Sequence, residues 1–229
     1  HGATFDNHKL GTFGKISNFS FYYAHHMTTI EGGMISTNDE SIYEVLRMYR
    51  SHGMVREACS REVRSRYQTD HPQLNPEFIF AYPGYNVRNN EIGAIIGLSQ
   101  LSRLDADNGK RRDNIKVFLE NLDARKYQVD FDLDGNSNYA FPLILNEPDV
   151  KLRGRLETVL RANDIEFRRG SAGGGNQLRQ PYLKGIVAEE MLSKFPNVEH
   201  IHFFGYYIAN IPDMTVDEIC ELCSILKKL

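Results

Sequence analysis

Two adjacent histidines, His25 and His26, lie in a short polar segment between two runs of β-forming residues. The runs are residues 16–21 and 32–37, so we expect two neighbouring strands with the histidines on the loop between them. An imidazole exchanges a proton near neutral pH and therefore suits general acid–base chemistry. Taken alone, histidines on a polar turn are more often solvated than catalytic, and His26 keeps this interpretation.

Other polar residues also have simple local interpretations. Ser20, at the end of the first run, is typical of a strand hydroxyl that bonds to nearby backbone. Asn86, in the segment GYNVRNN, suits the cap of the helix that follows it. The glycines of GGGNQLRQPYL (173–183) are typical of a flexible linker, and Arg179 lies within this segment.

The secondary structure around these residues is predicted from the spacing of apolar residues and from the positions of glycine and proline. Residues 39–53 place Ile42, Val45, Leu46 and Tyr49 on one helical face, and Gly53 is a natural terminator. Residues 54–83 contain prolines and several arginines, and they predict a long irregular loop with a functional or subunit-contact role. The arginines of that loop (Arg56, Arg61, Arg64, Arg66) suit a solvated face or, alternatively, a diphosphate site.

Two helices are expected next. Residues 89–105 predict one with a buried face that includes Ile92 and Ile95, and residues 108–123 predict a more polar one. After a boundary near residue 108, the expected order is strand 127–133, strand 139–146, helix 150–163, strand 165–169, helix 188–195, strand 201–211 and helix 215–229. This order predicts a small α+β lobe. Thr215 and Glu218 form a capping-box pattern at the start of the last helix.

Composition excludes some classes of protein. The 229 residues carry a net charge of −3, which disfavours a dedicated nucleic-acid or membrane binder. No apolar run approaches the roughly 20 residues of a membrane span, and no signal-peptide pattern opens the chain, so we expect a cytoplasmic protein. The opening HGATF lacks a methionine, which leads us to expect a piece of a larger protein.

The three cysteines do not form a disulfide framework. Cys59 stands alone. Cys220 and Cys223 have CxxC spacing, but they fall on the apolar face of the last predicted helix, so we expect core cysteines rather than a metal or redox site.

The segment SNFSFYYAHHMTTIEGGMIST (17–37) resembles the DegT/DnrJ/EryC1/StrS family of PLP-dependent sugar aminotransferases and dehydratases. The matching residues are Phe19, Ser20, Phe21, Thr28, Thr29, Glu31, Gly32 and Gly33. His25 stands where the aminotransferases carry their Schiff-base lysine. Residues 84–105 and 173–183 are similar to the family as well, so the resemblance spans essentially the whole chain.

The resemblance implies an α/β fold: the C-terminal portion of an aspartate-aminotransferase-like (type I PLP) fold. Residues 1–107 would be the C-terminal part of the large PLP-binding domain, and residues 108–229 the small C-terminal α+β domain. Family parts that contact the cofactor's phosphate and ring normally precede the residue matching His1. We therefore expect this chain alone to bind the cofactor poorly and to be inactive.

The resemblance also implies roles for four residues. His25 would be catalytic, as the general base at the C4′ carbon of the cofactor, and Ser20 would bind the phosphate of pyridoxal or pyridoxamine 5'-phosphate. Asn86 would reach the phosphate bound by a neighbouring subunit, which implies a homodimer with shared active sites. Arg179 would bind substrate, either the carboxylate of glutamate or the sugar nucleotide. No metal site is expected.

Histidine in place of the lysine is the pattern of the family's sugar 3-dehydratases. These remove the 3-hydroxyl of a nucleotide-linked 4-keto-6-deoxyhexose in deoxysugar biosynthesis, with glutamate converting PLP to its amine form. The CDP-linked type holds an iron–sulfur cluster with four cysteines, whereas this chain has only Cys59 in its central region, which favours the GDP-linked type. Two alternatives remain: an aminotransferase-like enzyme with another histidine-based reaction, and a non-catalytic cofactor-binding relative.

Overall fold

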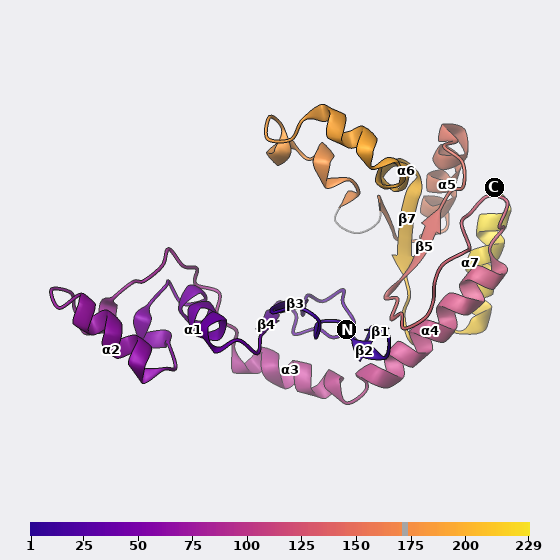
Figure 1. Cartoon of the computed structure of the whole chain (residues 1–229). Helices are drawn as coiled ribbons and strands as arrows, with labels where there is room; N and C mark the ends of the chain where they lie inside the picture. The colour runs from indigo at the N-terminus through magenta and orange to yellow at the C-terminus, as the bar shows by residue number, and fades with distance from the viewer. Residues whose placement is uncertain (171–173) are drawn as a thin grey trace. The chain divides into compact units, whose positions relative to one another are not determined.

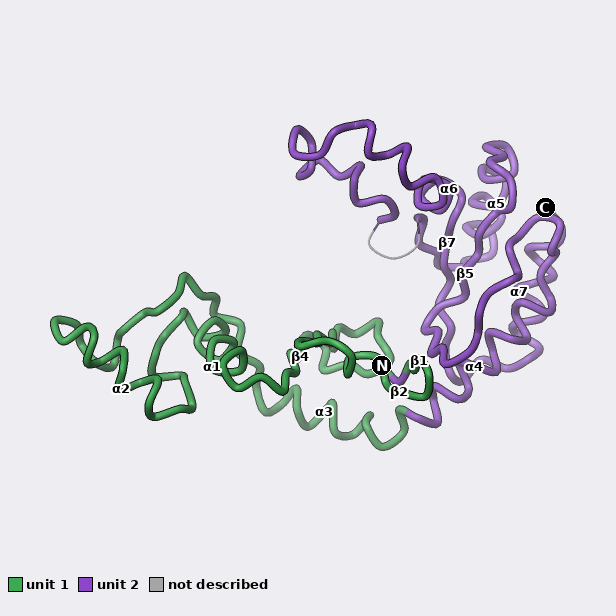
Figure 2. The backbone as a smooth tube through the Cα atoms, viewed as in Figure 1, with its two compact units in different colours: residues 1, 3–104 green, residues 2, 105–229 purple. Residues whose placement is uncertain are grey.

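Contacts between residues divide the chain into two units (Figure 2). The computed structural model describes residues 1–170 and 174–229. Unit 1 comprises residues 1 and 3–104, and unit 2 comprises residues 2 and 105–229. The boundary that the sequence suggests, near residue 108, falls within the helix α4 (Leu104–Asn121), whose first residue closes unit 1.

Unit 1 begins with two small antiparallel hairpins (Figure 1). They are formed by β1 (Thr4–Phe5) with β2 (His8–Lys9), and by β3 (Ser17–Ser20) with β4 (Gly33–Ser36). In the second hairpin Ser20 lies opposite Gly33, so the loop that contains the histidines leaves and rejoins the sheet at that pair. The predicted pair of strands on either side of this loop is confirmed.

The middle of unit 1 is more regular than the sequence predicts. It consists of α1 (Glu40–Tyr49), η1 (Val55–Glu57), α2 (Arg61–Asp70) and η2 (Pro76–Phe78), where η denotes a 3₁₀ helix. The helix α1 confirms one prediction, although Glu44 and Met48 are its buried residues. The prediction of an irregular loop over residues 54–83 is wrong. Its apolar residues form a small core with α1, made of Met48, Val55, Ala58 and Ile79.

A buried carboxylate explains why α2 forms from a sequence with little apolar periodicity. Glu44 on α1 accepts the backbone N–H groups of Cys59, at 2.7 Å, and Ser60, at 2.9 Å. Ser60 is in turn the N-cap of α2, and its hydroxyl accepts the Val63 N–H at 3.2 Å. Because a buried carboxylate requires such donors, the start of α2 depends on a contact with α1 that local sequence does not reveal.

The helix α3 (Glu91–Leu101) turns its glycines toward the rest of unit 1. Gly93 and Gly97 are buried, whereas Ile92 and Ile95 are 72% and 68% exposed. The predicted buried face with these isoleucines is therefore wrong for this chain. Glycine lacks a Cβ and permits the closest approach of another segment, and here that approach decides which side of α3 faces inward.

Unit 2 is a three-stranded antiparallel sheet with helices, which agrees with the predicted α+β lobe. The sheet order is β5–β7–β6. Besides α4, its elements are β5 (Ala140–Ile144), α5 (Val150–Ala162), β6 (Phe167–Arg169), η4 (Gln177–Arg179), η5 (Pro181–Leu183), η6 (Glu189–Lys194), α6 (Pro196–Phe204), β7 (Gly205–Ala209) and α7 (Val216–Lys227). The capping box of Thr215 and Glu218 at the start of α7 is present, as predicted.

Three predictions in unit 2 need correction. The expected strand 127–133 is reduced to an isolated bridge between Tyr127 and Leu145. The expected helix 188–195 is the 3₁₀ helix η6, and the first part of the expected strand 201–211 belongs to α6. In the first case two backbone hydrogen bonds flank the bridge, from the Gln128 N–H to the Ile144 carbonyl and from the Asn146 N–H to the Lys126 carbonyl, each at 2.9 Å, and residues 129–133 form no strand.

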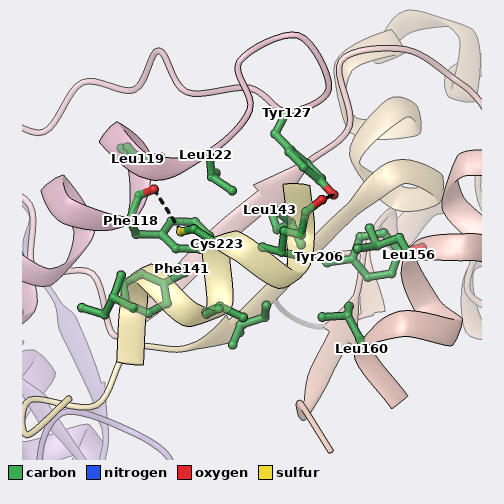
Figure 3. Close-up of a cluster of buried hydrophobic side chains, with 14 of the residues drawn as sticks. Phe118, Leu119, Leu122, Tyr127, Phe141, Leu143, Leu156, Leu160, Tyr206 and Cys223 are labelled. Atoms are coloured by element: carbon green, nitrogen blue, oxygen red, sulfur yellow. Dashed lines mark hydrogen bonds between the residues drawn. The ribbon is translucent and has the colours of Figure 1, made fainter. Parts of the chain in front are cut away.

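The core of unit 2 lies between its sheet and its helices (Figure 3). Phe118 on α4 stacks on Phe141 of β5, with ring centroids 4.4 Å apart. Cys223 is buried in this core, its thiol donates to the Phe118 carbonyl oxygen at 3.6 Å, and burial raises the thiol pKa to about 12. Cys223 is thus a core cysteine. Among the helices that the structure describes, none combines the length and the apolar composition that crossing a bilayer requires.

Substitution by alanine should change the free energy of unfolding in opposite directions at two glycines. Gly53 has φ +77°, and a Cβ there would lie 1.8 Å from the Tyr82 carbonyl oxygen, whereas a Cβ on Gly154 meets nothing within 4 Å. We expect Gly53→Ala to lower the free energy of unfolding by more than about 1–2 kcal/mol. Gly154→Ala should raise it by about 0.5–1 kcal/mol, since it lies inside α5. Urea unfolding measures both, and equal effects would contradict this prediction.

Candidate active site

The loop from residue 21 to residue 32 closes the hairpin of β3 and β4 (Figure 1). The Phe21 N–H donates to the Gly32 carbonyl at 2.8 Å, and the Thr29 N–H donates to the Phe21 carbonyl at 2.9 Å. Phe21 is buried and Thr29 is 8% exposed. These contacts bring the second half of the loop back onto its first residue, so the segment between them is held at both ends.

His25 lies in the segment that these contacts enclose. Its backbone N–H donates to the Tyr22 carbonyl at 3.1 Å, which forms a turn over residues 22–25. Its ring meets the Tyr22 ring edge-on, with centroids 6.2 Å apart. The His25 side chain is half-buried. An imidazole in this position is oriented by its neighbours and still accessible to a ligand.

Ser20 precedes the same loop, at the end of β3, and its side chain is exposed. The Ser20 hydroxyl oxygen accepts the Tyr22 N–H at 3.3 Å. A hydroxyl that accepts through a lone pair can still donate its own proton, and a phosphate oxygen is a suitable acceptor. The structure thus brings Ser20 and His25 together on one hairpin, linked through the backbone of Tyr22.

Asn86 lies in a different part of unit 1, beside the end of α1. It forms an isolated antiparallel bridge with Ser51, and the neighbouring Val87 N–H donates to the Arg50 carbonyl at 2.9 Å. The Asn86 side chain is exposed. The alternative that Asn86 caps the following helix is wrong, because α3 is capped by Asn90. The Asn86 amide is therefore not needed to begin that helix.

Arg179 lies in unit 2, where it is paired with a carboxylate. Its guanidinium donates from Nε to both oxygens of Glu199, at 2.9 and 3.0 Å, and from Nη2 to Oε2. The guanidinium also lies 4.9 Å from the centroid of the Phe203 ring. Sequence reasoning identified Arg179 but not its partner Glu199, which is 20 residues away and has no local pattern around it.

Gly175, four residues before Arg179, is more than part of a linker. Gly173 lies outside the described residues. Gly175 has φ +82°, and a Cβ there would lie 2.4 Å from His202 Nδ1. The next residue, Asn176, is buried; its N–H donates to that Nδ1 at 3.1 Å and its side-chain amide donates to Glu199 at 2.6 Å. Gly175 therefore permits a close packing that orients the Glu199 carboxylate toward Arg179.

Because Arg179 and Glu199 form an ion pair, we expect the free energy of unfolding to depend on pH. The Arg179 hydrogen bonds hold the Glu199 pKa below its usual value. A depressed carboxylate pKa contributes stability that is fully present above about 4.3, the value for an unpaired glutamate, and is lost as pH falls through the folded-state pKa. Between pH 6 and pH 3 the wild-type free energy of unfolding should therefore fall more steeply than that of Glu199→Gln. Urea titrations at several pH values test this, and parallel curves would contradict it.

Two of the arginines in residues 54–66 support local structure. Arg64 donates to the carbonyl oxygens of Ala58 and, at 2.9 Å, Cys59. The Arg56 guanidinium lies 5.0 Å from the Phe78 ring centroid. These contacts explain both side chains without a diphosphate ligand.

The polar groups of unit 1 fit a phosphate-bearing cofactor better than a metal. The hydroxyl of Ser20 and the amide of Asn86 are neutral donors, the type that complements a phosphate dianion. Within residues 1–170 and 174–229, no group of three or more His, Cys, Asp or Glu side chains could hold a metal ion. What unit 1 offers chemically is therefore an exposed hydroxyl, able to donate to a phosphate oxygen, and an imidazole on one hairpin.

The sequence profile of the DegT/DnrJ/EryC1/StrS aminotransferase family matches residues 1–227. GDP-4-keto-6-deoxy-D-mannose 3-dehydratase of Escherichia coli O55:H7 is 33% identical over 99% of this chain and 58% of its own length. A crystal structure of GDP-4-keto-6-deoxymannose-3-dehydratase with a trapped PLP-glutamate geminal diamine is 31% identical, with a TM-score of 0.76 over 98% of this chain and 58% of that one. GDP-perosamine synthase of Vibrio cholerae is 26% identical over 99% of this chain and 56% of its own length.

These matches confirm the predicted aminotransferase-type fold. The chain spans less than two thirds of the length of each of these relatives, 58% in the first case.

Proposed function

The chain belongs to the DegT/DnrJ/EryC1/StrS aminotransferase family, and we propose that its protein, in full natural length, is a PLP-dependent sugar 3-dehydratase. The substrate is a GDP-linked 4-keto-6-deoxyhexose, and the reaction removes its 3-hydroxyl in deoxysugar biosynthesis. The observation that carries this proposal is the imidazole of His25, held on the hairpin whose last strand residue is the phosphate-ligand candidate Ser20.

Histidine at this position decides the type of chemistry. An imidazole forms no stable Schiff base, so the cofactor is held without a covalent tether and its amine form persists for use on the sugar. Bound pyridoxamine phosphate supplies an amine for the 4-keto carbon and an electron sink for loss of the hydroxyl. His25 takes the proton from the cofactor's C4′ carbon, and the half-buried side chain on a short turn suits a base that must be both oriented and accessible.

The remaining candidate residues bind rather than react. Ser20 donates to the cofactor phosphate, and Asn86 donates to the phosphate in the neighbouring subunit's site, so the proposed assembly is a homodimer. Arg179 binds an anion, the carboxylate of glutamate or the sugar nucleotide. Glu199 uses the Nε and Nη2 edge of Arg179, so the ligand would bind donors on the opposite, Nη1 side of the guanidinium.

Glutamate and the GDP nucleotide are proposed from the relatives. The 33% identical E. coli protein is named for a GDP-linked sugar, and the solved dehydratase holds a PLP-glutamate adduct. The second candidate function is amino transfer to a nucleotide-linked sugar, which the likeness to a GDP-perosamine synthase favours. His25 weighs against it, because that reaction uses the lysine that this chain replaces.

A product assay tests the proposal. The full natural-length protein is incubated with PLP, glutamate and GDP-4-keto-6-deoxymannose, and the sugar is followed by mass together with ammonia and 2-oxoglutarate. We expect loss of the 3-hydroxyl with release of ammonia. Gain of an amino group by the sugar would support the second candidate, and cofactor binding with no reaction would support a non-catalytic relative.

A further inference from the structure

The side chain of Gln100 makes a two-point contact with the His25 loop. Gln100 Oε1 accepts the Thr28 N–H at 3.1 Å, and Gln100 Nε2 donates to the Thr28 carbonyl at 2.8 Å. The amide of one α3 residue thus satisfies both backbone groups of one loop residue, 72 positions away in the sequence. Such a pair fixes the position and the rotation of the Thr28 peptide groups.

The packing beside this contact is equally close. Thr29 is almost fully buried, and its Cγ2 lies 3.2 Å from where a Cβ on Gly97 would be. Its Cβ lies 3.4 Å from where a Cβ on Gly93 would be. The buried glycine side of α3 is therefore the surface on which Thr29 packs, and Gln100 continues that side by one turn.

His25 lies between this contact and the end of β3. On one side its N–H bonds to the carbonyl of Tyr22, whose own N–H bonds to Ser20. On the other side, three residues on, Thr28 is held by Gln100 and donates from Oγ1 to the Phe21 carbonyl at 3.1 Å. With both ends attached, the short segment between them has few backbone conformations left.

We propose that Gln100 is a positioning residue for the reaction, because it holds the loop so that the His25 imidazole stays in place to take its proton. The inference rests on the proposed function, in which His25 is the base. General bases need placement to within a fraction of an ångström, and a shift of about 1 Å can cost about 10²-fold in rate. Gln100 touches the loop backbone, so its effect on the chemistry passes through the loop.

Gln100→Leu tests this in the full natural-length protein with cofactor bound. Leucine has a similar size and a high helix propensity but makes neither hydrogen bond. We expect hydrogen–deuterium exchange of the Thr28 amide to rise roughly tenfold or more, since two hydrogen bonds are lost. We also expect kcat to fall about 10–100-fold with the KM for the sugar nearly unchanged, because base placement matters in the transition state.

Two further variants sharpen the test. Gln68→Leu makes the same change on an exposed position of α2 and should alter neither measurement. In Gln100→Glu the ionised carboxylate only accepts hydrogen bonds, so the bond donated to the Thr28 carbonyl is lost. When protonated, that carboxyl again offers one acceptor and one donor. We therefore compare the exchange rate of the Thr28 amide in each variant with the rate in wild type at the same pH. For Gln100→Glu this ratio should fall toward one as pH is lowered, whereas for Gln100→Leu it should stay high.

The outcomes separate the two proposals. Unchanged Thr28 exchange in Gln100→Leu would overturn the inference whatever the enzyme does. Raised exchange with an unchanged kcat would also overturn it, because the loop would then be held without consequence for His25. Raised exchange in a protein whose wild type removes no hydroxyl from the sugar would instead defeat the proposed function and leave the contact of Gln100 with the loop established.

Discussion

Replacing His25 by asparagine should lower the rate of dehydration by about 10²–10⁴-fold, the usual contribution of a general base. Asparagine is close to histidine in size and polarity but cannot take up a proton near neutral pH. The backbone hydrogen bond from residue 25 to the Tyr22 carbonyl does not involve the side chain, so the turn should remain. The loss should therefore appear in kcat rather than in the binding of cofactor or sugar.

The neighbouring histidine provides a matched control. His26→Asn makes the same chemical change one position along the loop, on a residue to which we assign no chemical role. We expect it to retain wild-type kcat within a few-fold. Single-turnover measurements with PLP and glutamate should show the same contrast, because that half-reaction also needs a proton to be moved at C4′. A His25→Asn enzyme with near-normal dehydration would mean that another group is the base.

Truncating Phe118 to alanine should have the largest effect on stability, a loss of about 3–5 kcal/mol in the free energy of unfolding. Phe118 is fully buried and stacks on Phe141 with centroids 4.4 Å apart, so its removal leaves a cavity and an unpaired ring (Figure 3). The Phe118 carbonyl also accepts the Cys223 thiol, and that contact links α4 to α7. Alanine keeps the backbone carbonyl and this hydrogen bond, so the loss of stability reports the contribution of the Phe118 ring.

Two companion variants make this prediction specific. Phe118→Leu refills most of the space and should cost clearly less than Phe118→Ala. Phe195→Ala removes the same ring from a residue of unit 2 that is 44% exposed, and it should change stability by about 0.5 kcal/mol or less. Thermal and urea unfolding give the values. Similar losses for Phe118→Ala and Phe195→Ala would contradict the assignment of Phe118 to the core.

Local signals predicted the elements that local interactions stabilise. The capping box of Thr215 and Glu218 is complete within one turn, and the structure contains it. The β-forming residues of 16–21 and 32–37, on either side of a polar turn, predicted the β3–β4 hairpin for the same reason, since the paired strands are close in sequence. Elements that depend on distant partners were mispredicted. The helix α2 begins where the buried Glu44 of α1 accepts two backbone N–H groups, and the expected strand at 127–133 pairs with the sheet only at its first two residues, Tyr127 and Gln128.

In the candidate site, too, the sequence indicated some residues, and others became apparent only in the structure. Ser20, His25, Asn86 and Arg179 were chosen as candidates because their segments resemble the family, and that resemblance is carried by the sequence. Their partners were not, because Glu199 lies 20 residues from Arg179 and Gln100 lies 72 residues from Thr28. No pattern in the chain connects these pairs until folding places them side by side.

By itself the sequence indicated the family, through its resemblance, and the order of most elements, and it contains His25, on which the proposed chemistry rests. The tertiary structure alone decided which side of α3 is buried, which amide holds the His25 loop and which carboxylate pairs with Arg179. These depend on close packing across long sequence separations. Whether Ile92 or Gly93 faces the hairpin is set by how near Thr29 can approach a residue without a Cβ.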